Sequence, residues 1–345
     1  MTALSSTVHA PLDTPQVLDR CRALVRPALR DAVARLHPWV GEMAAYSFGW
    51  CEVGGAPARA SGGKGVRQAL AVLGAEAAGA PGRAGVTAAV AVELVHVFSL
   101  VHDDIMDGDP ARRGRPTVWS AYGTGPAVLA GDGLFALAVQ TLAETAAGPE
   151  ALRLLSTALG DLVHGQADDL LFASRPWTGP RRVRPEEYRA MAEHKTGALL
   201  GCAAALGALL GGAPPATVAA LDRAGRQLGT AFQIVDDVLG IWGDPEVTGK
   251  PVHADLRERK KTYPVLAALG SPLPAAGRLA TLLESAGEPA EAAALIEKAG
   301  GRSAALSRAR RCVDSAEAAL AGVPLEGRAA GELRSLLAFL VRRDL

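Results

Sequence analysis

Two long stretches of the chain, residues 84–107 and 215–242, are apolar on nearly every side until each ends in a pair of adjacent aspartates. Their length and periodicity predict helices. A helix that is apolar all round belongs in the middle of a bundle. Carboxylates at the end of such a helix are costly unless they are paired or bind a metal. We therefore expect a helical bundle around two central helices with acidic ends.

The remaining segments also favour an all-α fold. Alanine, leucine and arginine dominate them, and valine and isoleucine never form the short alternating runs that strands need. Clusters of glycine and proline separate the helical segments. Besides the two central helices, the pattern predicts helices over 15–36, 38–50, 65–79, 125–147, 149–173, 185–211, 262–269, 274–286, 301–320 and 328–343. Loops are expected over 54–63, 108–116, 175–184 and 243–255.

No shift in composition marks a domain boundary along the 345 residues. We expect a single domain over residues 15–345, preceded by a disordered tail over residues 1–14. Since 49% of the residues are hydrophobic, the chain can bury a large core.

Charge and cysteine content exclude several classes of protein. Lys+Arg and Asp+Glu are equal at 36 each, so no global basic field attracts nucleic acid or an acidic membrane. The four cysteines have no metal-type spacing, which favours reduced thiols in a cytoplasmic protein. Residues 197–221 carry no charge, but glycines and prolines interrupt them, so we expect a buried helix and no stable membrane insertion.

The end of the first central helix carries an ordered polar stripe. His96, Ser99, Asp103 and Asp107 follow at intervals of three or four residues and therefore lie along one face. Asp103 and Asp107 are one turn apart, with Asp104 beside them. Carboxylates at that separation suit magnesium, which completes its octahedron with water and substrate phosphate.

The second central helix repeats the acidic pair as Asp236 and Asp237, and Asp244 follows seven residues later. The alternative is that both pairs are simply solvated helix ends. However, acids at a helix C-terminus oppose the helix dipole. Two buried helices that end in this way therefore favour a metal and phosphate site.

Basic residues occur where a diphosphate would need them. They are Lys64, Arg67, Arg112, Arg113, Lys195, Lys250, Lys260 and Lys261. An arginine pair in a turn after an acidic helix end is the strongest of these signals, because guanidinium can grip phosphate with two hydrogen bonds. The glycine–lysine segments do not have the spacing of a nucleotide-binding P-loop.

Taken together and in order, these motifs resemble those of the trans-isoprenyl diphosphate synthases, also called polyprenyl synthetases. The resemblance covers about residues 62–264. Its segments are GGKGVR, HVFSLVHDDIMDGDPARRGRPT, VLAGDGL, GQADDL, HKTG and the run from GTAFQIVDDVLG to KKTYPV. The resemblance implies an all-α isoprenoid-synthase bundle around a central cavity, usually as a homodimer.

The resemblance also implies a reaction and its residues. Isopentenyl diphosphate would condense head to tail with an allylic diphosphate, with three magnesium ions held by Asp103, Asp107 and Asp236. Asp104, Asp237 and Lys195 would complete the catalytic set. The allylic diphosphate would be bound by Arg112, Lys195 and Lys260, with Lys250 close by. Isopentenyl diphosphate would be bound by Lys64, Arg67, His96 and Arg113, and Thr196 and Gln233 would lie near the substrates.

One position departs from the family pattern, because Gly240 stands where the second motif usually has its third aspartate. We expect Gly240→Asp to be tolerated, since the glycine supplies no carboxylate. The departure keeps a non-catalytic partner subunit open as an alternative. A class I terpene cyclase is a further alternative, but such enzymes normally carry an Asn/Ser/Glu metal triad that is not found here.

Product length is expected to depend on the helix wall upstream of Asp103. A helix rises about 5.4 Å per turn, close to one isoprene unit. Ser99 is small enough to let a fifteen-carbon chain pass, and Phe98 is large enough to block the next extension. In related synthases an aromatic at this position accompanies twenty-carbon products, so geranylgeranyl diphosphate is the expected main product. A farnesyl or longer polyprenyl product is the alternative if Phe98 is ordinary core packing.

Overall fold

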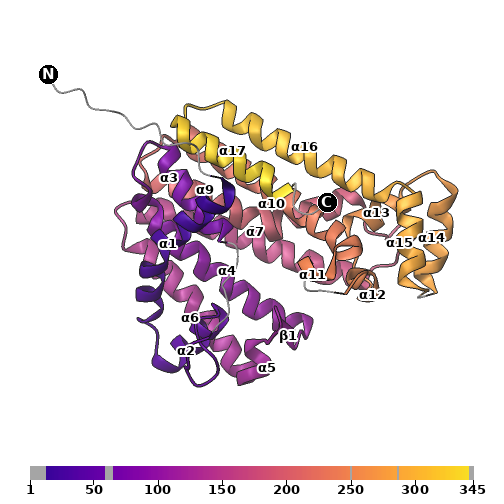
Figure 1. The fold of residues 1–345 in the computed structure, drawn as a ribbon, viewed down its shortest axis with the longest axis horizontal. Helices are drawn as coiled ribbons and strands as arrows, with labels where there is room; N and C mark the ends of the chain where they lie inside the picture. Colours follow the sequence, from indigo (N-terminus) through magenta and orange to yellow (C-terminus); the bar gives the residue numbers. More distant parts are fainter. Residues whose placement is uncertain (1–12, 59–64, 249–250, 286, 342–345) are drawn as a thin grey trace.

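The computed structural model describes residues 13–58, 65–248, 251–285 and 287–341, and these ranges are almost entirely helical (Figure 1). In chain order the helices are α1 (Thr14–Val33), α2 (Pro38–Ser47), α3 (Val66–Ala77), η1 (Gly82–Gly85), α4 (Val86–Asp107), α5 (Val118–Tyr122), α6 (Thr124–Ala143), α7 (Gly148–Ser174), α8 (Pro185–Ala192), η2 (Glu193–Gly197), α9 (Ala198–Leu210), α10 (Pro215–Trp242), α11 (Pro245–Thr248), α12 (Ala254–Arg257), α13 (Tyr263–Leu269), α14 (Pro274–Glu284), α15 (Pro289–Lys298), α16 (Gly301–Ala321) and α17 (Gly327–Val341). The strands of the described part, β1 (Ala111–Arg112) and β2 (Arg115–Pro116), form a short antiparallel hairpin after α4. The all-α prediction is confirmed.

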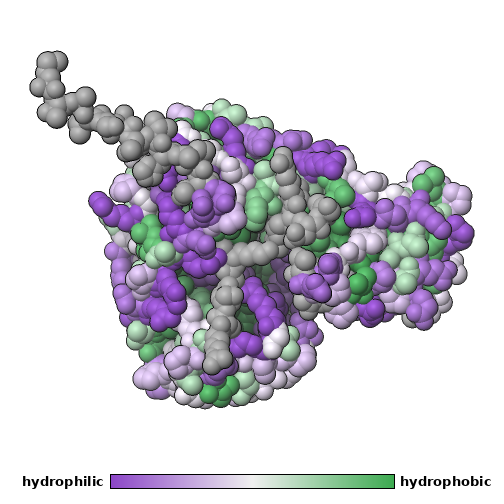
Figure 2. Space-filling view, in the orientation of Figure 1, coloured by the Kyte–Doolittle hydropathy of each residue, from purple (hydrophilic) through white to green (hydrophobic). Residues whose placement is uncertain are grey.

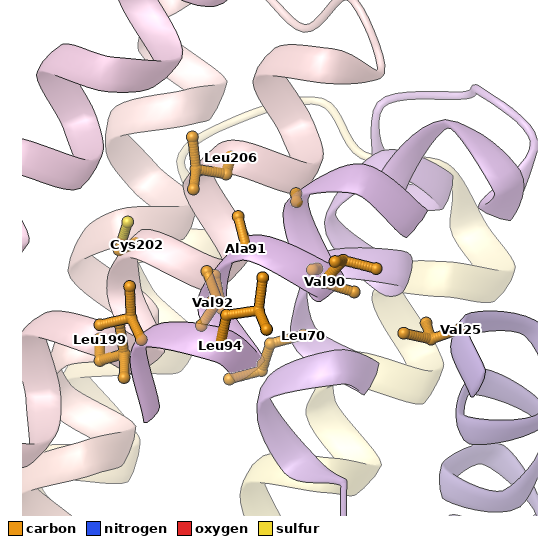
Figure 3. Packing of buried hydrophobic residues seen from close by; sticks show 14 of the residues in the cluster. Val25, Leu70, Val90, Ala91, Val92, Leu94, Leu199, Cys202 and Leu206 are labelled. Carbon is orange, nitrogen blue, oxygen red and sulfur yellow. The ribbon is translucent and has the colours of Figure 1, made fainter. Parts of the chain in front are cut away.

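The two helices with acidic ends lie inside the bundle. α4 packs against α3, α6 and α9, and α10 packs against α9 and α16. Leu94 on α4 and Leu228 on α10 are completely buried. Figure 3 shows Val92 and Leu94 of α4 beside Leu199 of α9 within one continuous core. Because the core fixes both helices, it also fixes the acidic residues at their ends.

The charge-free segment around α9 is a buried core helix, as expected. α9 and α3 approach so closely that a Cβ atom at Gly207 would lie 1.9 Å from the carbonyl oxygen of Ala71. A Cβ atom at Gly74 would lie 2.4 Å from the carbonyl oxygen of Ala204. The small residues of this segment therefore allow close helix packing.

The predicted helix over 185–211 is interrupted, which corrects the sequence prediction. Between α8 and α9 the chain forms the π-helical turn η2. Such turns are rare and occur frequently at functional sites. The surrounding helices pack tightly on η2, since a Cβ atom at Gly165 would lie 2.3 Å from the backbone nitrogen of Lys195. The turn thus sets the position of Lys195.

Other differences concern short elements and boundaries. The hairpin follows α4 where a loop was expected, and α5 and α15 lie in segments for which no helix was predicted. The helix predicted over 38–50 ends at Ser47. α1 begins at Thr14 with Asp13 as its N-cap, so the end of the expected tail is ordered. Residues 1–12 lie outside the described part. Short elements are missed because tertiary contacts stabilise them more than their own periodicity does.

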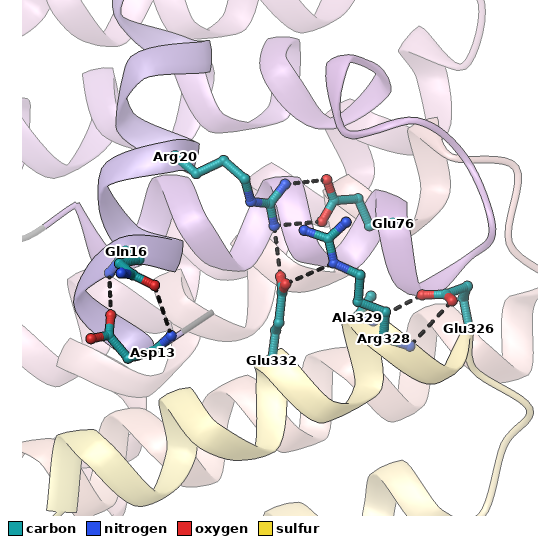
Figure 4. A network of polar contacts seen from close by, with 8 residues as sticks. All are labelled: Asp13, Gln16, Arg20, Glu76, Glu326, Arg328, Ala329 and Glu332. Carbon is teal, nitrogen blue, oxygen red and sulfur yellow. Dashed lines mark hydrogen bonds and ion pairs between the residues drawn. The ribbon is translucent and has the colours of Figure 1, made fainter. Parts of the chain in front are cut away.

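A polar network ties the C-terminal helix to the N-terminal half of the bundle (Figure 4). Arg20 of α1 donates to Glu76 of α3 at 2.5 and 2.9 Å and to Glu332 of α17 at 2.6 Å. Glu332 also accepts from Arg328 at 2.9 Å. The Glu332 side chain is only 4% exposed, so two arginines compensate a buried carboxylate.

Two helical stretches, Gly82–Asp107 and Thr124–Ala143, are long and apolar enough to span a membrane. In the first, 56% of the most apolar window is buried inside the protein, which accounts for its hydropathy as a core helix. In the second, 39% is buried, and α6 exposes Val128, Leu129 and Phe135.

Candidate active site

The acidic end of α4 carries two carboxylates that are accessible to different extents. Asp103 is half-buried and Asp107 is exposed, and Gly108 ends the helix in a left-handed conformation with a φ of 70°. Burial raises the pKa of Asp103 to about 6, and the negative charges of Asp107 and Asp169 act in the same direction. In Figure 2 the surface is hollowed between the body that carries α4 and the segment that carries α12, with hydrophilic side chains at the edge of the hollow.

Asp104 is buried, unlike the other two aspartates. It is 5% exposed, and its Oδ1 atom accepts from Nε of Arg112 at 2.7 Å. A second guanidinium nitrogen of Arg112 lies 2.7 Å from the same oxygen. Arg112 belongs to β1, so this ion pair holds the hairpin against the end of α4. Asp104 is thus a positioning residue for Arg112.

The two adjacent aspartates at the end of α10, Asp236 and Asp237, also differ in their burial. Asp237 is 4% exposed and accepts from the Tyr188 hydroxyl at 2.5 Å, from the Tyr263 backbone N–H at 3.0 Å and from Gln233 at 3.2 Å. Burial raises the pKa of Asp237 to about 8, although these hydrogen bonds oppose the shift. Asp236 is half-buried, and its negative charge opposes the lowering of the Arg67 pKa that burial causes.

Thr196 and Gln233, which were expected near the substrates, belong to the same network. The Thr196 hydroxyl donates to Oε1 of Gln233 at 2.9 Å, and Gln233 donates in turn to Asp237. η2 is therefore linked to the acidic end of α10 through one glutamine.

Lys195 lies between the acidic end of α4 and α7. Its Nζ atom lies 2.6 Å from Oδ2 of Asp169. Burial raises the pKa of both Asp103 and Asp107, and the positive charge of Lys195 opposes this shift. Asp169 was not among the expected site residues. Its sequence signal is another adjacent pair, Asp168 and Asp169, near the end of a long helix. Together, Asp103, Asp107 and Asp169 form an acidic wall with Lys195 as its nearest cation.

Burial and mutual repulsion disfavour the ionised form of these carboxylates. A divalent cation would compensate their negative charges, so the carboxylates fit such an ion. Within the described residues no set of three metal-ligating side chains converges on one point. Phosphate oxygens and water would complete such a coordination sphere.

Arg67 lies close to His96 of α4 and to Arg113. Nη1 of Arg67 lies 3.1 Å from Nε2 of His96. Burial lowers the pKa of Arg67 to about 10, and the nearby Arg113 lowers it further, whereas Glu93 and Asp236 oppose this shift. Nε of Arg67 is buried without a hydrogen-bond partner. Buried cations with donors left over are suited to bind an anion.

His96 is expected to be neutral with its proton on Nδ1. A guanidinium can only donate hydrogen bonds, so Nε2 must accept from Arg67. Burial lowers the pKa of His96 well below 6.5, and Arg67, Arg113 and Arg112 lower it further. Imidazole nitrogen chemical shifts should therefore report this neutral tautomer even at a pH just below 6.5. An imidazolium signal there would contradict the Arg67–His96 geometry.

Gly240 has a packing role that corrects the expected tolerance of Gly240→Asp. A Cβ atom at this position would lie 2.0 Å from Oδ2 of Asp255 and 2.5 Å from its Cγ. Asp255 is 7% exposed, and its charge raises the pKa values of Asp237, Tyr188 and Lys260. A carboxylate from α12 thus fills the space beside residue 240. Its position fifteen residues further along the chain gave no signal in the sequence.

Gly240→Ala is expected to lower the free energy of unfolding by about 1–3 kcal/mol, as overpacking of a filled site does. It should also displace Asp255 and lower turnover. Thermal denaturation and steady-state assays would measure both effects. Gly160→Ala on α7 is the matched control, because nothing lies within 4 Å of a Cβ atom there. Equal stability of the two variants would refute the packing role.

The remaining expected residues occupy separate places. Lys260 pairs with Glu258 at 2.6 Å, and its charge opposes the rise in the Asp107 pKa that burial causes. Asp244 lies beyond the end of α10 and accepts from the Glu246 N–H at 2.9 Å. Lys64 and Lys250 lie outside the described residues.

Phe98 forms part of an aromatic layer between α4 and α6. Its ring centroid lies 4.8 Å from that of His102 and 5.5 Å from that of Phe135. The hydroxyl of Ser99 donates to the carbonyl oxygen of His96 at 2.9 Å. Phe135 was not expected from the sequence, because only the packing of α6 on α4 brings it to Phe98.

Comparisons with known proteins agree with this geometry. The polyprenyl synthetase family model matches residues 57–299. The (2E,6E)-farnesyl diphosphate synthase of Mycobacterium tuberculosis is 44% identical over 341 residues, covering 96% of this chain and 94% of the relative. The geranylgeranyl diphosphate synthase of the same organism is 44% identical over 317 residues, covering 89% and 88%.

Solved structures give the same result. A polyprenyl synthetase from Streptomyces coelicolor is 47% identical with a TM-score of 0.90, covering 95% of this chain and 100% of the other. A geranylgeranyl pyrophosphate synthetase from Pyrococcus horikoshii is 32% identical with a TM-score of 0.82, covering 95% and 98%. The resemblance in sequence motifs, the helical bundle and these relatives agree, and the chain belongs to the polyprenyl synthetase family of trans-isoprenyl diphosphate synthases and is a prenyltransferase.

Proposed function

We propose that this prenyl diphosphate synthase is magnesium-dependent and makes geranylgeranyl diphosphate as its main product. The observation that carries the product assignment is the contact of Phe98, five residues before Asp103 on α4, with Phe135 of α6 at 5.5 Å between ring centroids. The relatives named as farnesyl and geranylgeranyl synthases are equally similar to this chain, so their names do not decide between products.

Asp103, Asp107 and Asp236 would hold the magnesium ions, up to three in number as the family resemblance implies. Bound there, the ions would neutralise the leaving diphosphate. Lys195 and Lys260, whose charges act on the α4 carboxylates, would bind the allylic diphosphate. Arg112, held by Asp104, would support the same group, with Lys250 as a further candidate.

Arg67 and Arg113 would bind isopentenyl diphosphate, with Lys64 as their expected partner. Neutral His96 would orient Arg67 through its Nε2 atom. The allylic C–O bond would break with the electron pair leaving on diphosphate, and the double bond of isopentenyl diphosphate would attack the resulting carbon. Loss of a proton from isopentenyl diphosphate would restore an allylic product. The cationic cluster favours this condensation over terpene cyclisation, which has no second diphosphate to bind.

We further propose that the enzyme is a cytoplasmic homodimer. The apolar side chains that α6 exposes, Val128, Leu129 and Phe135, support a partner surface on this helix. The four cysteines are buried and free, in keeping with a reducing compartment. Nucleic acid is not an expected partner of this neutral chain.

Product analysis tests the proposed function. The purified protein is incubated with magnesium, isopentenyl diphosphate and each allylic primer in turn, and product chain length is measured. Geranylgeranyl diphosphate is the expected main product. Absence of condensation with every primer would favour the non-catalytic subunit, and cyclic products would favour a terpene cyclase.

Variants of the aromatic layer test the length assignment. Phe98→Ala should shift products beyond twenty carbons, and Ser99→Phe should shift them toward fifteen. Since the Phe135 ring lies 5.5 Å from that of Phe98, the double variant Phe98→Ala/Phe135→Ala should lengthen products further. Unchanged product lengths in all three variants would show that α4 and α6 do not form the floor of the cavity.

A further inference from the structure

A second polar hollow lies outside the acidic site, with a volume of about 310 Å³. It is bounded by the segment between α7 and α8, the segment before α13 and the end of α14. The side chains that matter are Arg175, Trp177, Arg259, Lys261 and Glu284. None of these residues has a part in the proposed reaction.

Lys261 is a buried ammonium group in this hollow. The residue is 9% exposed, and its Nζ atom donates to the Ala173 carbonyl oxygen at 3.2 Å and lies 4.4 Å from the ring centroid of Trp177. Within the described chain no carboxylate forms an ion pair with it. An ammonium group has three N–H donors. Lys261 therefore has donors and an uncompensated charge to offer a ligand.

The surroundings of Lys261 are positive. Burial lowers the pKa of Lys261, and the neighbouring charges of Arg259 and Arg175 lower it further. Arg175 is paired with Glu187 at 2.9 Å. The one carboxylate that lines the hollow, Glu284, accepts from the Thr178 hydroxyl at 2.5 Å.

Arg259 is held at the hollow in an unusual conformation. Its φ of 55° lies in the left-handed region, which residues with a Cβ atom rarely adopt. Its guanidinium donates to the Leu283 carbonyl oxygen at 2.7 Å and lies 5.9 Å from the Trp177 ring. Surrounding contacts must maintain such a backbone conformation, and strained residues of this kind cluster at ligand sites.

We propose that this hollow is an anion site for a small phosphate-type group, inorganic phosphate or diphosphate, bound by Lys261 and Arg259 over the face of Trp177. The site needs no divalent metal, because its ligands are cations. It is separate from the diphosphate positions of the proposed reaction, although Lys260 lies between the two binding residues in the sequence. Binding would therefore restrain the segment that carries Lys260.

Equilibrium binding in the presence of EDTA tests the proposal without any turnover. Inorganic phosphate and inorganic diphosphate are titrated separately into the full-length protein, followed by tryptophan fluorescence and calorimetry. We expect a saturable fluorescence change with a Kd in about the millimolar range or tighter. Trp177→Phe should remove the fluorescence change but not the calorimetric heat. The tighter of the two anions identifies the preferred ligand.

Two variants test whether Lys261 and Arg259 bind the anion. Lys261→Met keeps the length and packing of the side chain, and Arg259→Gly relieves the left-handed conformation and should not impair folding. Each should weaken binding by about tenfold or more through loss of a charge-assisted hydrogen bond. Lys298→Met, which changes an exposed lysine on α15, is the control and should bind like wild type.

Wild-type affinity in both variants, or no response of the folded wild-type protein up to about 10 mM anion, would overturn the proposal. Synthase activity is measured separately on the same preparations. An inactive protein that still shows the Lys261-dependent response would count against the proposed function and not against this site.

Discussion

Asp103→Asn is expected to lower turnover by about a thousandfold or more while the fold is retained. The substitution removes a negative charge from the acidic wall of Asp103, Asp107 and Asp169 but keeps the shape of the side chain. Burial and these neighbours already disfavour the ionised form of Asp103. Loss of the charge should therefore cost little stability in the absence of metal, and the loss of activity should reflect weaker magnesium binding.

Steady-state kinetics over a range of magnesium concentrations measure the loss of activity, and thermal denaturation measures the change in stability. Asp314→Asn is the matched control, because Asp314 is an exposed aspartate on α16 far from α4 in the chain. Turnover near that of the control would refute the metal role of Asp103. A large loss of stability would instead indicate a structural role.

The second large effect is that substitutions at the adjacent Asp236 and Asp237 should differ in their effect on the free energy of unfolding. Asp237→Ala should lower the free energy of unfolding by about 2–4 kcal/mol, because the buried Tyr188 hydroxyl and the Tyr263 N–H both lose their acceptor. Asp236→Ala should lower the free energy of unfolding by less than Asp237→Ala does, because Asp236 is half-buried whereas Asp237 is buried. It should nevertheless lower turnover by orders of magnitude if Asp236 holds magnesium.

Chemical denaturation of both variants in EDTA gives the stabilities, and turnover at saturating magnesium gives the activities. Tyr188→Phe provides a further check, since it removes one donor to Asp237 and leaves Asp236 unchanged. Equal losses of stability at positions 236 and 237 would contradict a structural role for Asp237 and a metal-binding role for Asp236. The same reasoning applies to Asp104, whose ion pair with Arg112 gives it a positioning role.

Much of the candidate site could be predicted because its signals are local. The spacing of His96, Ser99, Asp103 and Asp107 follows from helix periodicity alone. The structure accordingly places Asp103 and Asp107 beside Lys195, and Arg67 beside His96. Helix periodicity alone does not show which aspartate of each pair is buried, because that depends on how α4 and α10 are rotated within the bundle. Only the family resemblance distinguished Asp103 and Asp236 from the aspartates beside them.

The residues that sequence reasoning missed are those brought in by packing. Asp169 comes from α7, Phe135 from α6 and Asp255 from α12. Each belongs to another helix than the residue beside it. Asp169 and Asp255 fall within the segments that resemble the family, but nothing in those segments shows which side chain they approach. Gly240 was misjudged for the same reason, since the missing carboxylate was visible in the sequence but the Asp255 side chain that fills its place was not.

The sequence by itself determined the all-α class, the two acidic helix ends, the basic turns and the family. These depend on periodicity and on the order of short motifs, which are properties of neighbouring residues. The tertiary structure decided that Asp104 and Asp237 point inward, that η2 presents Lys195 through a π-helical turn, and that Lys261 lies in a hollow of its own beside Trp177. The physical reason is that side-chain orientation and burial follow from close packing between distant helices, which helical periodicity does not specify.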